Sequence, residues 1–403
     1  MRISPNFFLT RHLREARLAS PAQKIRMKVL LVGHTYLVPI NWAKLNALVS
    51  IGIDLQVLQP ANWRNLDGLF LGKVPAQQSE DGRPLFLMEN VVRPGHTASH
   101  LFTPLQALRT VARVRPDLIH IENEGYSYLA TEMAALAKYV SAKTTLFVWE
   151  NLDRRIHWSQ TVCRKITLPM TNGLVCGSSG AEGQYRRWGF RGPTAVIPQL
   201  GVDPTLFHAT EKLEASRPFT VGYIGRLVHQ KGCDILLTAS QLLGSRGLNL
   251  RCKICGSGPE RAELEALSDR LRLGSIASFH DTVSPEEVPG VLNTLDVLVL
   301  PSRTVPFWAE QLGHILLEAM SAGVVVVGSR SGAIPEVIGQ DSLLFQEDDP
   351  QELAAILAKL ADNSEFYRES REYGMKRVKQ KYTHEVIARQ LAAFWSSVLN
   401  GRE

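Results

Sequence analysis

The chain is poor in cysteine and has no long hydrophobic run, and each lack argues against a class of protein. Its five cysteines are an odd number in 403 residues and lie at Cys163, Cys176, Cys233, Cys252 and Cys255. The last two are spaced like a metal or redox pair, but no second pair and no suitable histidines accompany them, so buried reduced thiols are favoured. No segment reaches the apolar length that crosses a bilayer. We therefore expect a cytoplasmic protein.

Three motifs of nucleotide and metal chemistry are also missing. No GxGxxG fingerprint is present, which disfavours an NAD-dependent dehydrogenase. The loop 225–232 does not end in GK[ST], which excludes a Walker loop. No DxD-type metal site accompanies the motifs described below, because Glu347-Asp348-Asp349 has the character of a surface turn. We therefore expect neither a metal ion nor a cofactor.

What is present is the composition of an ordinary globular protein, with 45% hydrophobic and 21% charged residues. A chain of 403 residues exceeds what one core usually organises, so two domains are expected. The net charge of +6 is mildly basic and suits an anionic ligand or an anionic membrane surface. We expect no nucleic-acid partner.

Apolar strand-like runs alternate with helical spacing in two successive halves of the chain, which predicts an α/β fold with two parallel sheets. Examples are the strand Phe219–Ile224 and the helix Trp42–Ser50. The expected domains are residues 27–207 and 219–380, joined by the polar linker 208–218 and followed by a helix in residues 381–403.

Residues 1–26 stand apart from this pattern. They are basic but lack the continuous apolar core of a signal peptide. We interpret them as a disordered extension. The alternative is a short basic amphipathic helix over Phe7–Leu18 that rests on anionic lipid.

The most informative stretch runs from Asp296 to Glu336. A buried strand at Asp296–Leu300 is followed by a loop, by helical spacing over Gln311–Ala322, and by a second buried strand at Val324–Val327. This order makes a βαβ unit, whose loops carry polar residues that could bind a ligand.

Two glutamates flank the start of the helix in this unit. Glu310 precedes the helix and Glu318 lies inside it, about 12 Å further along at about 1.5 Å per residue. Between them, the amides of Gln311, Leu312 and Gly313 open a helix N-terminus that suits a phosphate. Carboxylates for hydroxyls beside free amides fit a nucleotide-sugar. The alternative is that Glu310 caps the helix and Glu318 is a solvated helix residue.

Further candidate residues lie where other strands end. Arg226 and Lys231 follow the strand Phe219–Ile224, where both side chains could converge on phosphate oxygens, although such a basic pair is often only solvated. Gly33 ends the first strand and allows close approach of a ligand. Gly225 and Gly256 lie in the corresponding loops of the second half.

The segment DLIHIENE ends another strand in the first half. Alternation places His120 and Glu122 on the same face of this strand, so either side chain could reach a cleft at its end. An ordinary pair of residues at a strand end is an equally good interpretation.

Four phrases of the chain resemble retaining glycosyltransferases of family 4, which have the GT-B fold. They are PSRTVPFWAEQLGHILLEAMSAG, IGRLVHQKGCDILLTA, GSGPE and IPQLGVD, and the resemblance is strongest over residues 219–336. It implies two Rossmann-like domains that face each other across a cleft, with the final helix packed back onto the first domain.

The resemblance also implies roles for the candidate residues. Arg226 and Lys231 would hold the departing diphosphate in place of a metal ion, Glu310 would orient sugar hydroxyls, and Glu318 would bind the ribose. The loop at Gly256 would lie near the nucleobase. In the first domain, Glu122 stands where many relatives have a sugar-contacting histidine, and Gly33 lacks a second glycine beside it.

The expected function is retaining, metal-independent transfer of a sugar from a nucleoside-diphosphate-sugar to a saccharide, lipid-linked or small-molecule acceptor. The expected place is the cytoplasm, with peripheral contact at the inner membrane face as an option. Two rivals stay open, a nucleotide-sugar epimerase of the same fold and a non-catalytic protein that binds nucleotide-sugar.

Overall fold

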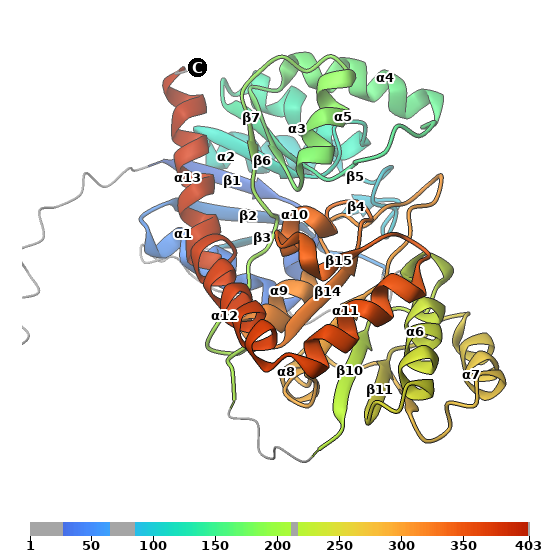
Figure 1. Ribbon diagram of the computed structural model, residues 1–403. Helices are drawn as coiled ribbons and strands as arrows, with labels where there is room; N and C mark the ends of the chain where they lie inside the picture. Colours follow the sequence, from blue (N-terminus) through green and yellow to red (C-terminus); the bar gives the residue numbers. More distant parts are fainter. Residues whose placement is uncertain (1–26, 65–84, 211–216, 402–403) are drawn as a thin grey trace, which may run out of the picture.

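The computed structural model describes residues 27–64, 85–210 and 217–401. The expected extension 1–26 and the middle of the linker 208–218 lie outside these residues. Within the described ranges, no helix is both long enough and apolar enough to cross a membrane. Two α/β domains lie one above the other, the first drawn in blue to green and the second in yellow to red (Figure 1).

The N-terminal domain is built on a seven-stranded parallel sheet in the order β3-β2-β1-β6-β7-β8-β9. Apart from the edge strands β3 and β9, which are partly exposed, its strands are largely buried on both faces, as parallel strands require. They are β1 (Lys28–Val32), β2 (Asp54–Pro60), β3 (Phe86–Glu89), β6 (Leu118–Glu122), β7 (Lys143–Val148), β8 (Gly173–Cys176) and β9 (Thr194–Val196). A small antiparallel pair joins β4 (Val91–Val92) to β5 (Leu101–Phe102).

The C-terminal domain has a six-stranded parallel sheet in the order β12-β11-β10-β13-β14-β15. Its strands are β10 (Phe219–Ile224), β11 (Leu250–Cys255), β12 (Ala277–His280), β13 (Val297–Leu300), β14 (Val325–Ser329) and β15 (Leu344–Phe345). The prediction of two parallel-sheet domains is therefore confirmed.

Helices cover both faces of each sheet. The first domain contains α1 (Trp42–Ser50), α2 (Pro104–Val114), α3 (Tyr128–Tyr139), α4 (Trp158–Thr167) and α5 (Ser179–Arg187). The second contains α6 (Cys233–Ser245), α7 (Arg261–Arg270), α8 (Val288–Leu292), α9 (His314–Ser321), α10 (Ile334–Ile338), α11 (Pro350–Asp362) and α12 (Ser364–Lys381). The last helix is α13 (His384–Asn400).

Strand β1 shows how alternation sorts side chains into two cores. Val29 and Leu31 belong to a cluster that includes Trp395 of α13 and side chains of α1. Leu30 and Val32 point the other way, into a cluster with side chains of α2 and α3. Helix α13 therefore completes the core of the first domain, although it follows the second domain in the chain, and Figure 1 shows it beside α1 and β1.

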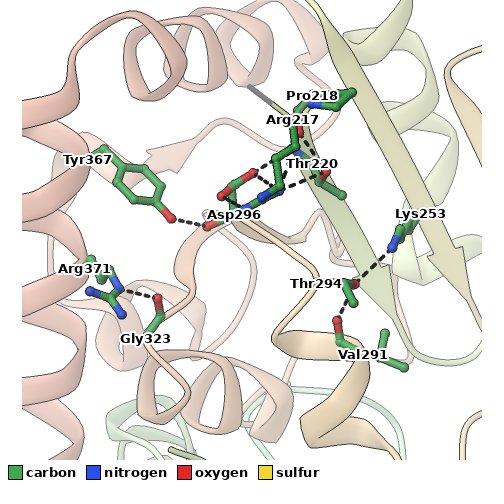
Figure 2. A network of polar contacts seen from close by, with 10 residues as sticks. All are labelled: Arg217, Pro218, Thr220, Lys253, Val291, Thr294, Asp296, Gly323, Tyr367 and Arg371. Atoms are coloured by element: carbon green, nitrogen blue, oxygen red, sulfur yellow. Dashed lines mark hydrogen bonds and ion pairs between the residues drawn. The ribbon is translucent and has the colours of Figure 1, made fainter. Parts of the chain in front are cut away.

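Helix α12 was not expected from the sequence, and polar contacts hold it at the base of the second domain. Tyr367 Oη donates to the carbonyl of Asp296 at 3.3 Å, and Arg371 Nε donates to the carbonyl of Gly323 at 2.8 Å (Figure 2). The carboxylate of Asp296 in turn accepts from the Arg217 guanidinium at 2.6 and 2.9 Å and from the Thr220 amide at 2.9 Å. The network joins α12 to the starts of β10 and β13.

Helix α9 begins at His314, three residues later than the expected Gln311. The reason is Gly313, whose φ of +71° lies outside the helical range. Residues 311–313 therefore stay in the loop directly before the helix.

Candidate active site

The loops that leave the carboxyl ends of the strands meet between the two domains, where ligands bind in open parallel sheets. The Asn151 side chain, after β7, donates from Nδ2 to the carbonyl of Glu310 at 3.1 Å. Ser179, at the start of α5, donates from its amide and its hydroxyl to Glu336 Oε2 at 2.9 and 2.8 Å. These bonds hold loops of the second domain against the carboxyl ends of the strands in the first sheet.

A cavity of about 370 Å³ lies between these loops. From the first domain it is lined by Asn151, Leu152, Ser178, Ser179 and Gly180, and from the second by Thr304, Ala309, Gly332, Ala333, Pro335 and Glu336. Its walls are mostly small or polar side chains and backbone, which suits a hydroxylated ligand.

The structure brings Lys231 and Glu310 together as an ion pair. Lys231 Nζ lies 2.6 Å from Glu310 Oε2, and the Ser302 hydroxyl donates to the same oxygen at 2.8 Å. The side chains are 16% and 7% exposed, so the pair is largely shielded from water. The ammonium also lies 4.8 Å from the centre of the Trp308 ring. Loop 301–310 therefore holds the lysine in place before any ligand arrives.

The Arg226 guanidinium and the three backbone amides before α9 form no hydrogen bonds among the described residues, so they are available to a ligand. Arg226 is exposed, and its guanidinium has no hydrogen bond or ion pair with any residue that the structure describes. The amides of Gln311, Leu312 and Gly313 likewise donate to no atom in residues 27–64, 85–210 and 217–401. Because a free cation and free amides both favour negatively charged oxygens, each of these two places suits a phosphate.

Two glycines allow the backbone to come close at this site. A Cβ on Gly313 would lie 2.6 Å from Leu300 Cδ2, and its φ is in the left-handed region. A Cβ on Gly256 would lie 1.8 Å from the carbonyl oxygen of Gly225, so the loops after β10 and β11 touch through backbone alone. A side chain at Gly256 would push these two loops apart, and one at Gly313 would clash with Leu300.

Glu318 is held by its own helix in this structure. Its Oε1 lies 3.1 Å from Nδ1 of His314, and Nε2 of the same imidazole lies 3.0 Å from the carbonyl of Gly201. Burial lowers the pKa of His314, but the hydrogen bond and charge of Glu318, together with the hydrogen bond to the Gly201 carbonyl, outweigh it and leave the pKa raised. This chain of contacts links Glu318 to the segment where the polypeptide passes between the domains.

Glu122 lies at the end of β6 beside Gly33, but its carboxylate is fully buried and fully engaged. Oε1 accepts from Lys44 Nζ at 2.6 Å and from Tyr36 Oη at 2.8 Å, and Oε2 accepts from Gln199 Nε2 at 2.9 Å. Burial raises its pKa, yet the charge of Lys44 is among the effects that hold the pKa below its usual value. The role expected for Glu122 toward a sugar stays a prediction.

His120 faces the core between the first sheet and α13. Its Nδ1 lies 2.9 Å from the Thr145 hydroxyl, and its ring is 5.1 Å from that of Trp395. Burial lowers its pKa to about 3, so the imidazole is neutral near neutral pH.

Sequence reasoning missed the residues that support this site from other loops. Ser302 and Trp308 hold the Lys231–Glu310 pair, and Arg303 fixes the loop before Lys231 by donating to the His229 carbonyl at 2.9 Å. All three lie in the loop after β13. Their position directly after a buried strand is the signal that could have found them.

A second group was missed at the carboxyl ends of β1 and β2. His34, which follows Gly33, stacks on Trp63 at 4.7 Å, and His100 meets the same ring at 4.9 Å. Nδ1 of His34, Nε2 of His100 and the side-chain amide of Gln59 are buried without a hydrogen-bond partner among residues 27–64, 85–210 and 217–401. Unpaired buried polar atoms near a cleft are candidates for contacts with a ligand. No group of three or more histidines, cysteines or acidic residues in the described ranges could hold a metal ion.

The family model described as glycosyl transferases group 1 matches residues 207–377. A D-inositol 3-phosphate glycosyltransferase of Corynebacterium jeikeium is 32% identical over 229 residues, which are 52% of this chain and 53% of that protein. A 2-deoxystreptamine glucosyltransferase of Streptomyces kanamyceticus is 31% identical over 145 residues, 36% of each chain. The chain spans about half the length of the curated relatives that it matches, or less.

Solved structures extend the likeness to both domains. The HepE protein of Anabaena in complex with UDP superposes with a TM-score of 0.72 at 18% identity, covering 92% of this chain and 100% of that one. A sucrose-phosphate synthase of Thermosynechococcus elongatus gives a TM-score of 0.68 at 18% identity and covers 93% and 100%. The expected GT-B fold is thereby confirmed, and the likeness to the glycosyl transferases group 1 family covers residues 207–377, most of the second domain.

Proposed function

We propose that the protein transfers a sugar from a nucleoside-diphosphate-sugar to an acceptor, with retention of anomeric configuration and without a metal ion. The acceptor is a saccharide, a lipid-linked or a small molecule bound on the side of the first domain. The observation that carries the proposal is the combination of Arg226, the Lys231–Glu310 pair and three unbonded amides in the loops that follow β10 and β13.

In this proposal the cations meet the charge that the leaving diphosphate develops. As the bond between the anomeric carbon and the phosphate oxygen breaks, Arg226 and Lys231 stabilise the released oxygen, and the amides of residues 311–313 bind the other phosphate oxygens. Lys231 would move from Glu310 to the phosphate. The freed carboxylate of Glu310 would then accept hydrogen bonds from the sugar hydroxyls.

Glu318 would bind the ribose after exchanging its bond to His314 for ribose hydroxyls. The loop at Gly256 would lie against the base. On the acceptor side, the unpaired atoms of His34, Gln59 and His100 provide hydrogen-bonding groups for acceptor hydroxyls. Glu122 would act there through its neighbours, because its own oxygens are already bonded.

Binding of the donor is tested by titration calorimetry with UDP-glucose and then with other nucleoside-diphosphate-sugars. Arg226→Gln should weaken binding of the best donor roughly tenfold or more, because a hydrogen bond to a charged group is lost. The matched control is Arg270→Gln, which removes an exposed arginine on α7 of the same domain and should leave binding unchanged.

The reaction is tested by following release of nucleoside diphosphate with candidate acceptors and assigning the product anomer by NMR. A product with the donor's anomeric configuration supports the proposal. If no nucleoside-diphosphate-sugar binds, the proposal is wrong. Release of an epimerised free sugar without any acceptor would instead identify an epimerase.

A further inference from the structure

Helix α4 carries its apolar side chains on the outside of the molecule. Trp158, Val162 and Ile166 recur at intervals of four residues and are 72%, 46% and 47% exposed. Residues at that spacing lie in one row along a helix. The row contains three of the ten large hydrophobic side chains that are exposed in the described residues, so it is a concentrated feature rather than scattered surface.

The inner side of the same helix is polar. Tyr128 Oη of α3 donates to the Ser159 hydroxyl at 2.9 Å, and the hydroxyls of Thr131 and Thr167 lie 2.8 Å apart. A surface helix normally packs its apolar side onto the protein and turns its polar side to water. Because α4 does the reverse, its outer side is suited to contact with an apolar phase or partner.

The surroundings of the apolar row are basic. Arg164 and Lys165 lie in the last turn of α4, and Arg155 comes just before the helix. Beside the helix is a cavity of about 390 Å³ whose lining includes Arg164, Lys165 and Arg191 and no acidic side chain. An apolar row with a tryptophan at one end and cations around it matches the interface of an anionic bilayer, where tryptophan rings and basic residues are favoured.

The position of α4 places this surface near the cleft. Asn151, whose side chain contacts Glu310 across the domains, precedes Trp158 by seven residues. A chain of that length spans at most roughly 25 Å. Figure 1 shows α4 at the periphery of the first domain, on the far side of α3 from the strands.

We propose that the outer face of α4, with Trp158, Val162 and Ile166 at its centre and Arg155 and Lys165 around it, docks on an anionic phospholipid bilayer. Docking would hold the cleft within reach of an acceptor carried by the membrane. This surface is distinct from residues 1–26, and the proposal concerns binding to lipid rather than the reaction in the cleft.

The test is flotation of the full-length protein with vesicles of phosphatidylcholine alone or mixed with phosphatidylglycerol. The wild type should bind only the mixed vesicles. The triple variant Trp158→Gln, Val162→Gln, Ile166→Gln should bind the mixed vesicles at least about tenfold more weakly than the wild type. Lys165→Gln alone should weaken binding about fivefold. The control is Leu105→Gln with Tyr139→Gln, two residues of α2 and α3 that are 55% and 72% exposed, and it should bind like the wild type.

A second measurement places the helix directly. Vesicles with acyl-chain-brominated lipid should quench tryptophan emission in the wild type, and Trp158→Phe should keep binding but lose part of that quenching. Unchanged melting and unchanged donor binding of the triple variant keep this test separate from the proposed reaction. The proposal fails if the wild type does not bind the mixed vesicles or if the triple variant binds them equally well. It also fails if self-association, measured by sedimentation, is the one property that the triple variant loses.

Discussion

Replacing Lys231 should damage both the stability of the second domain and its chemistry, and a paired substitution can separate the two effects. Lys231→Met keeps the length of the side chain but leaves the Glu310 carboxylate, which is 7% exposed, with the Ser302 hydroxyl as its one side-chain partner among the described residues. Removing one member of a buried ion pair typically costs about 3–5 kcal/mol. The Lys231 side chain is 16% exposed and Ser302 stays bonded, so we expect about 3 kcal/mol.

Adding Glu310→Gln to Lys231→Met removes the uncompensated charge. The double variant should therefore recover about 1.5 kcal/mol or more of the lost free energy of unfolding, measured by urea titration. Turnover should not recover with stability. Loss of one preorganised donor to the leaving group costs roughly 10²–10³ in rate, and the double variant lacks it as well.

The control is Arg270→Met, which breaks a pair whose members are 58% and 70% exposed and should change stability by less than about 0.5 kcal/mol. The measurements are unfolding and release of nucleoside diphosphate from the donor. Wild-type turnover in Lys231→Met would refute the role of this lysine. A double variant as unstable as Lys231→Met would refute the charge argument.

Glu122→Gln should lower the free energy of unfolding by about 3 kcal/mol or more, since it leaves the buried ammonium of Lys44 without a counter-charge; unchanged urea unfolding would show that the pair adds nothing. Burial raises the pKa of Glu124 to about 7 from 4.5, so the protonated form stabilises the fold below pH 4.5 and that contribution is lost as the pH rises through 7. Glu124→Gln should therefore gain stability relative to wild type by roughly 2–4 kcal/mol between pH 4.5 and pH 8 in thermal melts, and a pH-independent difference would count against this assignment. Asp296→Ala should destabilise the second domain by about 3 kcal/mol because the Arg217 guanidinium loses its partner, and a melting temperature equal to that of wild type would speak against the network in Figure 2. Transfer activity should survive exhaustive chelation, and loss of activity that magnesium restores would contradict the metal-independent mechanism.

Much of the fold could be predicted because burial along one element leaves a pattern in the sequence. The strand Phe219–Ile224 and the helix Trp42–Ser50 have the expected bounds, since a parallel strand needs a continuous apolar run and a surface helix needs an apolar stripe. The positions of Lys231 and Glu310 also followed from sequence, because each lies in a loop directly after a buried strand. The family motifs, rather than spacing, pointed to the class of reaction.

Helix α12 shows where this pattern is absent. Its fully buried positions are Ser370, Gly374 and Val378, and two of these three carry little apolar surface. A Cβ on Gly374 would come within 3.0 Å of Met320, so close approach of two helices, not a hydrophobic stripe, decides the packing there. Helix α4 is the opposite case, because its apolar row exists in the sequence but faces outward.

Most segments that form strands and helices, the loops that follow the strands, and the residue types in those loops could be read from the sequence alone, with α12 as the exception. Tertiary structure alone decided which side chains meet. Lys44 and Glu122 are 78 positions apart, and Lys231 and Glu310 are 79 apart, yet both pairs lie at 2.6 Å. Periodicity records how each element meets its own surroundings, whereas the partner of a buried charge is set by how separate elements pack, and that information is spread over the whole chain.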